Sequence, residues 1–197
     1  MIEYPEGATP LNPSEMEGLK YKYVSTRGEL DQLEQGSIQT GLRWLSRSRN
    51  KNILDELFIR ELHKRLFGEV WKWAGKFRTT EKNIGIEPRE ISIQLRILLD
   101  DVRYWIENDT YPPEEIAIRF HHRLVLIHLF PNGNGRHARI IADALLSKAF
   151  GKQPINWAGG HDLQTMGIRR KEYIAALKAA DQGNYDPLLA FAGIKHT

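Results

Sequence analysis

The stretch that decides the fold is LVLIHLFPNGNGRHARIIADAL, residues 124–145. An apolar run ends at His128, Pro131 interrupts it, and a glycine-rich turn leads into a second run that begins near Arg136. Such a turn at the start of a helix presents unpaired backbone N–H groups and a partial positive charge, which favour a bound anion. The stretch therefore predicts two helices joined by a phosphate-binding turn, and it indicates phosphoryl or nucleotidyl transfer.

His128 is the candidate general base, because a histidine beside an anion-binding turn can take up a proton near neutral pH. The alternative is a histidine buried in the core, but the neighbouring turn favours the catalytic role. A zinc site is a further alternative, since the nearby histidines are His121, His122 and His137. No H-E-x-x-H pattern or cysteine supports zinc, so we favour the base.

The candidates for phosphate binding are Gly133, Asn134, Gly135, Arg136 and Arg139. Glycine lets backbone N–H groups approach phosphate oxygens, and two glycines around an asparagine exceed what an ordinary helix-entry turn needs. The two arginines would hold a triphosphate and neutralise charge on its leaving group. Arg139 could also pair with Asp143, four residues further along a helix.

The motif resembles the signature of the Fic/Doc family, HPFxxGNGRxxR. The matching positions are His128, Phe130, Gly133, Asn134, Gly135, Arg136 and Arg139. Leu129 stands where the family has proline, and Asn132 stands where most members carry Asp or Glu. The segments WKWAGKFRTTEKNIGI and RRKEYIAALKAADQGNY resemble the subgroup called mobile mystery protein B, and the likeness extends from about Thr9 onward.

The resemblance implies an all-α Fic-fold helical bundle with a short β-hairpin flap, and a protein adenylyltransferase activity. In the family, the matching histidine takes a proton from a Ser, Thr or Tyr hydroxyl of a target protein. That hydroxyl attacks the α-phosphate of ATP, and pyrophosphate leaves. Mg²⁺ is the implied cofactor, with Asn132 as its ligand; an uncharged amide should bind the ion more weakly than a carboxylate.

Residues 77–87 match a flap that pins an extended piece of the target by strand addition, so we expect target contacts there. The residues that would make these contacts are Thr79, Thr80 and Lys82. The residue types favour extended backbone, and a surface loop is the alternative. Tyr173 matches a region that closes over the nucleotide base in Fic proteins, and packing in the core is its alternative role.

Fic enzymes are often inhibited by a helix carrying (S/T)xxxE(G/N), whose glutamate captures the second motif arginine, here Arg139. The two candidates for this glutamate are Glu17 and Glu34. Neither is a full copy of the motif, because Pro13 stands where Ser or Thr is expected before Glu17, and Gln35 follows Glu34. We prefer Glu17.

The 197 residues suffice for one domain with a proper core, which we expect over 29–197, after an irregular N-terminal extension over 1–28. Helical periodicity predicts about seven helices, with Asn52 capping the second. Their approximate ranges are 29–51, 53–67, 91–107, 114–128, 136–149 and 168–180, with turns over 14–19 and 187–191.

The composition excludes some classes of protein. The absence of cysteine excludes disulfides, thiolate metal sites and cysteine nucleophiles. A net charge of +3 is compatible with a nucleotide or a nucleic acid but diagnostic of neither. The N-terminus lacks a secretory pattern and no apolar run approaches the ~20 residues of a membrane span, so we expect a cytoplasmic protein without membrane association.

Three functions stay open at this point. The first is transfer of AMP to a protein hydroxyl, by a toxin-like and autoinhibited enzyme, with an antitoxin or a second copy of the chain as further partner. The second is a Doc-like phosphotransferase, which the Gly135-Arg136 pair disfavours because Doc members carry a lysine-containing variant. The third is a non-catalytic nucleotide- or nucleic-acid-binding module, favoured by Asn132, Leu129 and the basic charge. We prefer the first, and do not expect nucleic acid as a partner.

Overall fold

The computed structural model describes residues 10–49, 52–157, 163 and 167–194. Within these ranges the chain forms eight α-helices and one 3-10 helix, and an isolated bridge between Leu19 and Trp71 is the single β feature. The elements are α1 (Pro13–Met16), α2 (Arg27–Arg47), α3 (Glu56–Phe67), η1 (Pro88–Glu90), α4 (Ile91–Glu107), α5 (Pro113–Ile127), α6 (Asn134–Phe150), α7 (Ile168–Asp181) and α8 (Asp186–Phe191). The all-α prediction is confirmed. Residues 1–9 of the predicted extension lie outside the described residues.

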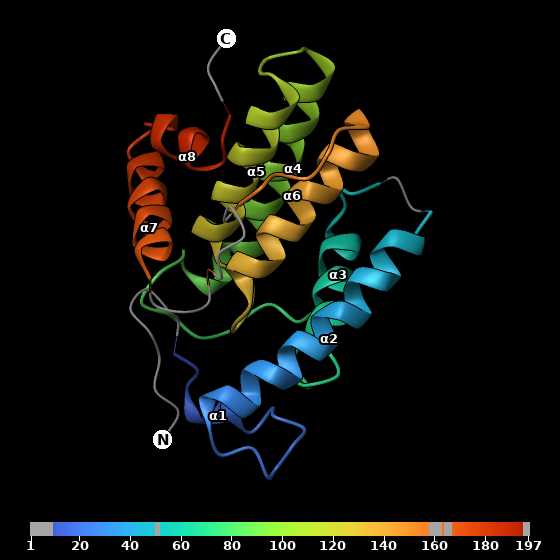
Figure 1. Ribbon diagram of the computed structural model, residues 1–197, viewed down its shortest axis with the longest axis vertical. Helices are drawn as coiled ribbons and strands as arrows, with labels where there is room; N and C mark the ends of the chain where they lie inside the picture. The colour runs from blue at the N-terminus through green and yellow to red at the C-terminus, as the bar shows by residue number, and fades with distance from the viewer. Residues whose placement is uncertain (1–9, 50–51, 158–162, 164–166, 195–197) are drawn as a thin grey trace.

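The helices α5 and α6 form the central pair of the bundle (Figure 1). On one side α4 packs against α5, while α3 packs against α6 and carries α2 on its outer surface. The helices α7 and α8 pack on each other and against α5. The link between α5 and α6, residues 128–133, therefore lies at one end of the central pair. No helix in the described part of the chain combines the length and apolar character needed to cross a bilayer.

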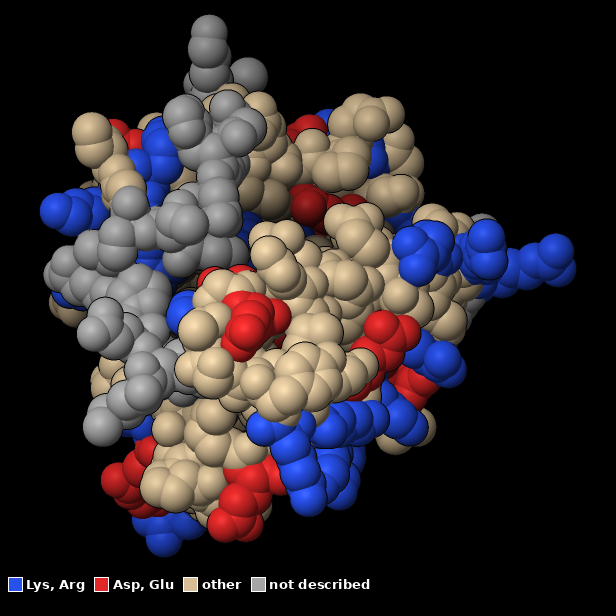
Figure 2. Space-filling view, turned by 60° about the horizontal axis from the view of Figure 1, so that its bottom comes forward, with Lys and Arg blue, Asp and Glu red and all other residues tan. Residues whose placement is uncertain are grey.

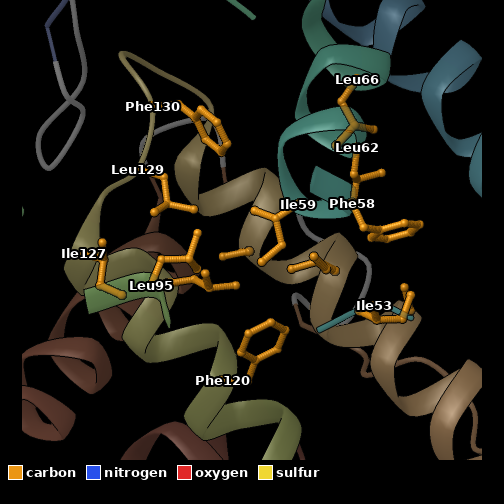
Figure 3. Packing of buried hydrophobic residues seen from close by; sticks show 14 of the residues in the cluster. Ile53, Phe58, Ile59, Leu62, Leu66, Leu95, Phe120, Ile127, Leu129 and Phe130 are labelled. Atoms are coloured by element: carbon orange, nitrogen blue, oxygen red, sulfur yellow. The ribbon is translucent and has the colours of Figure 1, made fainter. Parts of the chain in front are cut away.

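The main core forms where α3, α4, α5 and α6 meet. Its members with no more than 1% exposure include Ile59, Leu62, Leu66, Leu95, Phe120 and Ile141. Leu129 and Phe130, from the link, are also in this core, at 1% and 0% exposure (Figure 3). Each such side chain contributes about 1.5–3 kcal/mol on burial. The phosphate-binding turn is thus anchored to the core by its own first residues, and the leucine in place of proline supplies part of that anchor.

A second cluster joins α7 and α8 to the central pair. It contains Ala117 and Ile118 of α5, Ala142 and Leu146 of α6, Trp157, Tyr173 and Leu188. Small alanines on α5 and α6 leave room for the aromatic rings, because interiors pack to nearly crystalline density. The consequence for the site is that Tyr173, on α7, is brought against the face of α6.

The helices α2 and α3 begin at other residues than the sequence predicts. At α2, the Glu29 N–H donates to Thr26 Oγ1 at 3.2 Å and the Thr26 N–H donates to the Glu29 carboxylate at 3.0 Å, so this capping box starts the helix earlier than expected. At α3, Asp55 is the N-cap and accepts from the Leu57 N–H at 3.0 Å. Asn52 does not cap α3, because the chain stays non-helical until Asp55 presents its oxygen.

The described part of the N-terminal segment is more ordered than predicted. A capping box between Asn12 and Glu15 starts α1. Next to the isolated bridge, the Lys20 N–H donates to the Val70 carbonyl at 3.0 Å and the Lys72 N–H donates to Gly18 at 2.8 Å. The segment is therefore attached by backbone hydrogen bonds to the chain that follows α3.

Candidate active site

His128 terminates α5 in a left-handed backbone conformation, with φ 59° and ψ 63°. Its N–H still donates to the Leu124 carbonyl at 3.1 Å, so the residue is the C-cap of the helix. Residues other than glycine rarely adopt this conformation, and those that do concentrate at functional sites. The conformation turns the chain into the 129–133 link and leaves the His128 side chain 4% exposed.

The environment keeps the His128 imidazole uncharged. Its pKa is lowered to about 4, mainly by burial and also by the positive charges of Arg78 and Lys82, while a hydrogen bond to the Val125 backbone raises it. At neutral pH the ring is therefore in the form that accepts a proton. An uncharged ring is the form that the predicted general-base role requires, and that role stays a prediction.

Arg78 is a site residue that the sequence reasoning missed. Its side chain is 2% exposed, and its Nε–H donates to the His128 carbonyl at 2.6 Å. The same guanidinium donates to the Ile127 carbonyl at 3.3 Å and to Thr80 at 2.9 Å, and also bonds Ile86. Arg78 thereby joins residues 77–87 to the end of α5. All its hydrogen-bond partners are backbone carbonyls, so no pattern of side chains in the sequence could have predicted this role.

The predicted β-hairpin flap is a loop. No strand occurs in residues 77–87, all of which are described. In a hairpin, backbone N–H groups of the opposite strand would donate to the Thr80 and Ile86 carbonyls. Here the Arg78 guanidinium donates to both carbonyls instead. Gly85, with φ +101°, lies so close to the site that a Cβ there would be 2.6 Å from the His128 Cβ. The loop is therefore held tightly beside the candidate base without a β ladder.

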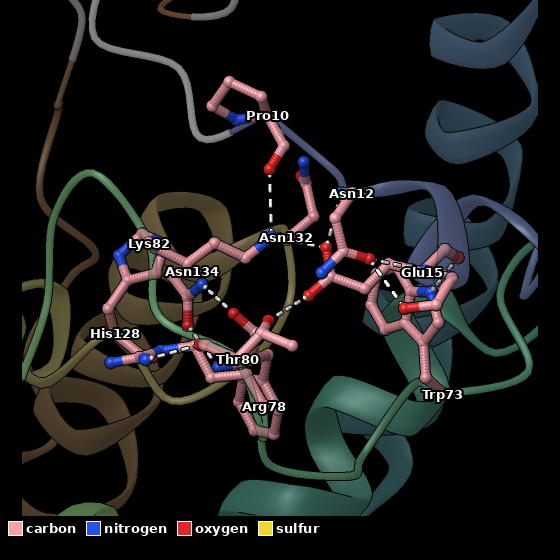
Figure 4. Close-up of polar contacts among 12 residues, drawn as sticks. Pro10, Asn12, Glu15, Trp73, Arg78, Thr80, Lys82, His128, Asn132 and Asn134 are labelled. Atoms are coloured by element: carbon pink, nitrogen blue, oxygen red, sulfur yellow. Dashed lines mark hydrogen bonds and ion pairs between the residues drawn. The ribbon is translucent and has the colours of Figure 1, made fainter. Parts of the chain in front are cut away.

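Two of the three predicted target-binding residues face inward (Figure 4). Thr80 Oγ1 donates to Glu15 at 2.8 Å. Lys82, 3% exposed, forms an ion pair with Glu15 and donates to the Pro10 carbonyl at 2.9 Å. Thr79 is exposed and lines a pocket together with Arg78, Glu81, Glu87, Pro88 and Arg89. Thr80 and Lys82 thus hold the N-terminal segment against the loop, whereas Thr79 is exposed.

The turn before α6 is shaped by Gly133 and Asn134. Gly133 has φ +79°, and a Cβ there would lie 2.7 Å from the Phe67 ring. Asn134, 4% exposed, accepts from the Phe130 N–H at 2.9 Å and donates to the Phe130 carbonyl at 2.7 Å. Its amide is therefore used to close the turn and is not directed at a phosphate. At Gly135 a Cβ would meet nothing nearer than Arg139, at 3.7 Å, so the start of α6 is open on that side.

Asn132 uses its amide oxygen within the turn. Oδ1 accepts from the Gly133 N–H at 2.6 Å and lies 3.5 Å from Arg136 Nη2. Its backbone carbonyl is 3.1 Å from His63 Nε2, a fully buried histidine on α3 that the sequence reasoning also missed. Among the described residues, no three His, Cys, Asp or Glu side chains are grouped to hold a metal ion. The residues around Asn132 do not fit a protein-held Mg²⁺ site.

Arg136 is anchored by Glu34 of α2. The two side chains form an ion pair at 2.8 Å and are 12% and 3% exposed. Glu34 also accepts from Trp71 Nε1 at 2.7 Å, and the Arg136 guanidinium lies 4.8 Å from the Phe67 ring centre. Of the two glutamates predicted as inhibitory, Glu34 reaches the motif, but at its first arginine and not at Arg139. Glu17 is exposed at the C-cap of α1.

Arg139 faces Tyr173. Arg139 Nη1 donates to the Tyr173 hydroxyl at 3.4 Å, and the guanidinium lies 5.5 Å from the ring centre. Tyr173 is 6% exposed, so its ring is covered and does not form an open platform for a base. Asp143 accepts hydrogen bonds from the Ile155 N–H and Trp157 Nε1, both at 3.0 Å, and influences Arg139 through its charge. The predicted pair of Arg139 with Asp143 is replaced by these contacts.

The site can be described chemically from these contacts. A neutral, buried imidazole ends α5, and a glycine-rich turn opens the positive end of α6. Arg139 lies in the second turn of α6 and is partly buried. Anions bind where a helix begins, and guanidinium groups bind phosphate oxygens. The arrangement defines a site that can bind a phosphorylated molecule and take a proton next to it.

Comparison with known proteins agrees with this class. Residues 53–146 match the model of the Fic/DOC family. The chain is 29% identical over 161 residues to protein adenylyltransferase fic-1 of Caenorhabditis elegans, covering 78% of this chain and 28% of that protein. It is 30% identical over 137 residues to protein adenylyltransferase Fic of Drosophila grimshawi, covering 68% of this chain and 26% of that protein. This chain therefore spans less than a third of the length of either relative.

Solved structures show the same fold. Fic-1 from C. elegans superposes with a TM-score of 0.67 at 27% identity, covering 89% of this chain and 51% of that chain. The BepC protein from Bartonella tribocorum, solved with bound AMPPNP, gives a TM-score of 0.68 at 19% identity, covering 94% and 99%. The chain carries a Fic/DOC family domain with the Fic fold.

Proposed function

We propose that this domain transfers AMP from ATP to a Ser, Thr or Tyr hydroxyl of a protein target. His128 accepts the hydroxyl proton as the oxygen attacks the α-phosphorus. The new bond is the P–O bond to the target, the broken bond is that between the α-phosphorus and the pyrophosphate oxygen, and pyrophosphate leaves. General-base help of this kind is worth roughly 10²–10⁴ in rate.

The observation that carries the proposal is the position of His128. Its uncharged ring lies directly before the turn that opens α6, so proton acceptor and phosphate site are separated only by the 129–133 link. The names of the two relatives, both protein adenylyltransferases, and the AMPPNP bound to BepC support ATP as the substrate. Arg139 and the open side of Gly135 are the features that would bind the triphosphate.

The experiment that tests the proposal uses two labelled forms of ATP. We expect the chain to transfer label from α-labelled ATP to proteins of a cell lysate, and His128→Ala to abolish the transfer. Label from γ-labelled ATP should stay in solution. Transfer of the γ-label instead would identify a phosphotransferase, and no transfer of either label, together with retained ATP binding, would identify a non-catalytic binding module.

Magnesium dependence is a separate proposal, supported by the resemblance to the family and opposed by the contacts of Asn132. An ion would have to compete with the Gly133 N–H for the amide oxygen. We expect Asn132→Asp to lower the Mg²⁺ concentration needed for half-maximal AMP transfer, because a carboxylate binds Mg²⁺ better than an amide. Asn132→Ser serves as the uncharged control, and an unchanged Mg²⁺ titration in the Asp variant would contradict the assignment.

We also propose that Glu34 restrains the site. While Glu34 pairs with Arg136, that guanidinium is not available to a triphosphate. Glu34→Gly should raise automodification severalfold, whereas Glu17→Gly, on the exposed end of α1, should leave it at the wild-type level. Because Glu34 also binds Trp71, the unfolding midpoint of each variant is measured in parallel, and Glu34→Gln serves as the milder change. Unchanged automodification in both folded Glu34 variants would exclude inhibition by this residue.

One face of the molecule offers little support for nucleic acid as the partner. On the face shown in Figure 2, Lys and Arg side chains are interspersed with Asp and Glu and do not form one continuous basic area. Nucleic-acid-binding surfaces are usually single-signed, since they neutralise phosphates. A protein with an acceptor hydroxyl is the partner we propose.

Several finer assignments stay predictions. They are the mobile mystery protein B subgroup, a toxin-like role, an antitoxin or homodimer partner, a cytoplasmic location and a domain boundary at residue 29. The relatives reported above are animal proteins, so the subgroup assignment rests on the quoted sequence segments alone.

A further inference from the structure

We infer that Tyr173 and His121 form a buried pair that positions Arg139 toward the triphosphate. The inference deepens the proposed function, because it assumes that Arg139 binds the phosphates of ATP. Tyr173 and His121 are positioning residues in this scheme, since neither is placed to touch the nucleotide. The three residues come from α7, α5 and α6, so the pair also connects the central helices to α7.

Two hydrogen bonds connect His121 to Arg139 through the Tyr173 hydroxyl. The Tyr173 hydroxyl lies 2.8 Å from His121 Nε2, and it accepts from Arg139 Nη1 at 3.4 Å. His121 is 0% exposed and Tyr173 is 6% exposed, so water does not compete freely for these groups. The hydroxyl is therefore held at a defined point beneath the Arg139 guanidinium.

The direction of each hydrogen bond follows from the chemistry of the groups. A guanidinium has donors but no acceptor, so the Tyr173 oxygen must accept from Arg139. In the arrangement we infer, its own O–H donates to His121 Nε2 of an uncharged imidazole whose proton is on Nδ1, an atom that is buried without a hydrogen-bond partner among the described residues. Burial lowers the pKa of His121 well below 6.5 and raises the pKa of Tyr173, so both groups keep the protonation states that this order needs.

The His121 ring is held in place by its neighbours. Its centre lies 4.4 Å from the centre of the Trp157 ring, and Trp157 Nε1 donates to Asp143 at 3.0 Å. Asp143 lies on α6, one turn beyond Arg139. His121, which bonds the Tyr173 hydroxyl, is thus packed against Trp157, and Trp157 is in turn hydrogen-bonded to Asp143 of α6.

Positioning matters here because arginine is flexible. Fixing a long side chain on binding costs up to about 2 kcal/mol of conformational entropy, and a side chain that is already oriented avoids part of that cost. Arg139 has no carboxylate partner at hydrogen-bond distance among the ion pairs of the described residues, unlike Arg136 with Glu34. Tyr173 is uncharged and orients Arg139 without neutralising it, while the Asp143 carboxylate acts on Arg139 only through its charge and forms no ion pair with it within the described part of the chain.

The test compares the affinities of the full chain for ATP and for adenosine by calorimetry. Tyr173→Phe keeps the ring and removes the hydroxyl, and we expect it to weaken ATP binding about three- to tenfold, the effect of one hydrogen bond. His121→Gln should weaken ATP binding in the same direction. Adenosine, which has no phosphate, should bind each variant as it binds the wild type.

The matched control is Tyr185→Phe. Tyr185 also bonds a buried histidine of α5, His122, with its hydroxyl 2.9 Å from Nδ1, but its hydroxyl is not bonded to Arg139. This variant should bind ATP like the wild type. In an Arg139→Gln background, Tyr173→Phe should cause no further loss of affinity for ATP, because Tyr173 acts on the nucleotide only by orienting Arg139.

Other outcomes would overturn the inference. Equal losses for ATP and adenosine would mean that Tyr173 contacts the base, and an additive loss in the Arg139→Gln background would mean that it acts independently. The Nε–H resonance of Arg139 in the NMR spectrum tests the pair without nucleotide: it should shift in Tyr173→Phe and in His121→Gln, and an unmoved resonance contradicts the pair. If the wild type binds no ATP, the proposed function fails while this resonance still decides the inference.

Discussion

His128 and Gly133 mark the two ends of the turn, and both have left-handed backbone conformations, with φ 59° and 79°. For Gly133 the sequence contains the reason, because glycine adopts this conformation without strain. For His128 the conformation is supported by contacts, namely the Arg78 bond to its carbonyl and the burial of Leu129 behind it. The geometry of the site therefore depends on the two single residues, His128 and Gly133, that reverse the direction of the chain.

Gly133→Ala tests this dependence. A Cβ at Gly133 would lie 2.7 Å from the Phe67 ring, in a backbone conformation that costs a non-glycine residue about 1–2 kcal/mol. We expect the free energy of unfolding to fall by at least about 2 kcal/mol, measured by urea denaturation. Gly135→Ala is the control, because a Cβ there has space and helical backbone, and it should change stability by less than about 0.5 kcal/mol. Equal effects of the two substitutions would contradict this account of the turn.

The helix α1 and the loop over residues 77–87 are joined by side-chain contacts into one unit. Glu15 accepts from Thr80 and Lys82, and Trp73 Nε1 donates to the Glu15 carbonyl at 2.9 Å (Figure 4). The loop cannot rely on a β ladder, so these contacts and those of Arg78 determine its shape. This explains why the sequence prediction of a hairpin was wrong: extended residue types do not reveal that side chains will bond the carbonyls.

Glu15→Gln should loosen the loop selectively. The substitution leaves the nearly buried Lys82 ammonium without an opposite charge, and breaking a buried pair costs about 3 kcal/mol. Hydrogen exchange of the backbone amides in 77–87 should accelerate at least tenfold, while amides in α5 and α6 stay protected. Glu17→Gln, on the exposed end of α1, should have no such effect. Unchanged exchange in the Glu15 variant would show that Arg78 alone determines the loop.

Several histidines are buried across the whole molecule, and most lie around the site. Burial lowers the pKa of His128 and of His137 to about 4, and lowers those of His63 and His121 well below 6.5. In the unfolded chain these groups titrate near 6.5. These histidines therefore bind protons less readily in the folded protein than in the unfolded chain, and this difference makes the free energy of unfolding depend on pH.

Stability should fall as the pH decreases from 6.5 toward 4. A histidine with a depressed folded-state pKa stabilises the fold above its unfolded pKa, and His128 and His137 each lose on the order of 3 kcal/mol over that interval. Asp143 acts oppositely, since burial raises its pKa to about 6, and its contribution is lost as the pH rises through that value. Urea midpoints at pH 7, 6 and 5 should decrease in that order, and the decrease should be smaller in His137→Gln. Urea midpoints that do not change with pH would contradict the uncharged state of the buried histidines.

The helices and the residue types of the motif could be predicted from local patterns in the sequence. Apolar periodicity predicted α4 at its observed bounds, and the glycine-rich turn after His128 predicted a helix start at a phosphate-binding position. These features are local: helix formation depends on neighbours three and four residues apart, and a helix start favours anions whatever surrounds it. The same local signal led to the family, because the motif residues lie within one short segment.

The partner of each charged residue could not be predicted from the sequence, because it depends on how the helices pack. Arg136 pairs with Glu34 of α2, Lys82 with Glu15 of α1, and Arg139 faces Tyr173 of α7. Such contacts join segments far apart along the chain, and they depend on how whole helices pack, which no local pattern encodes. The physical reason is that an ion pair or a buried hydrogen bond forms wherever packing brings its groups together, and burial then makes each group costly to leave unpaired.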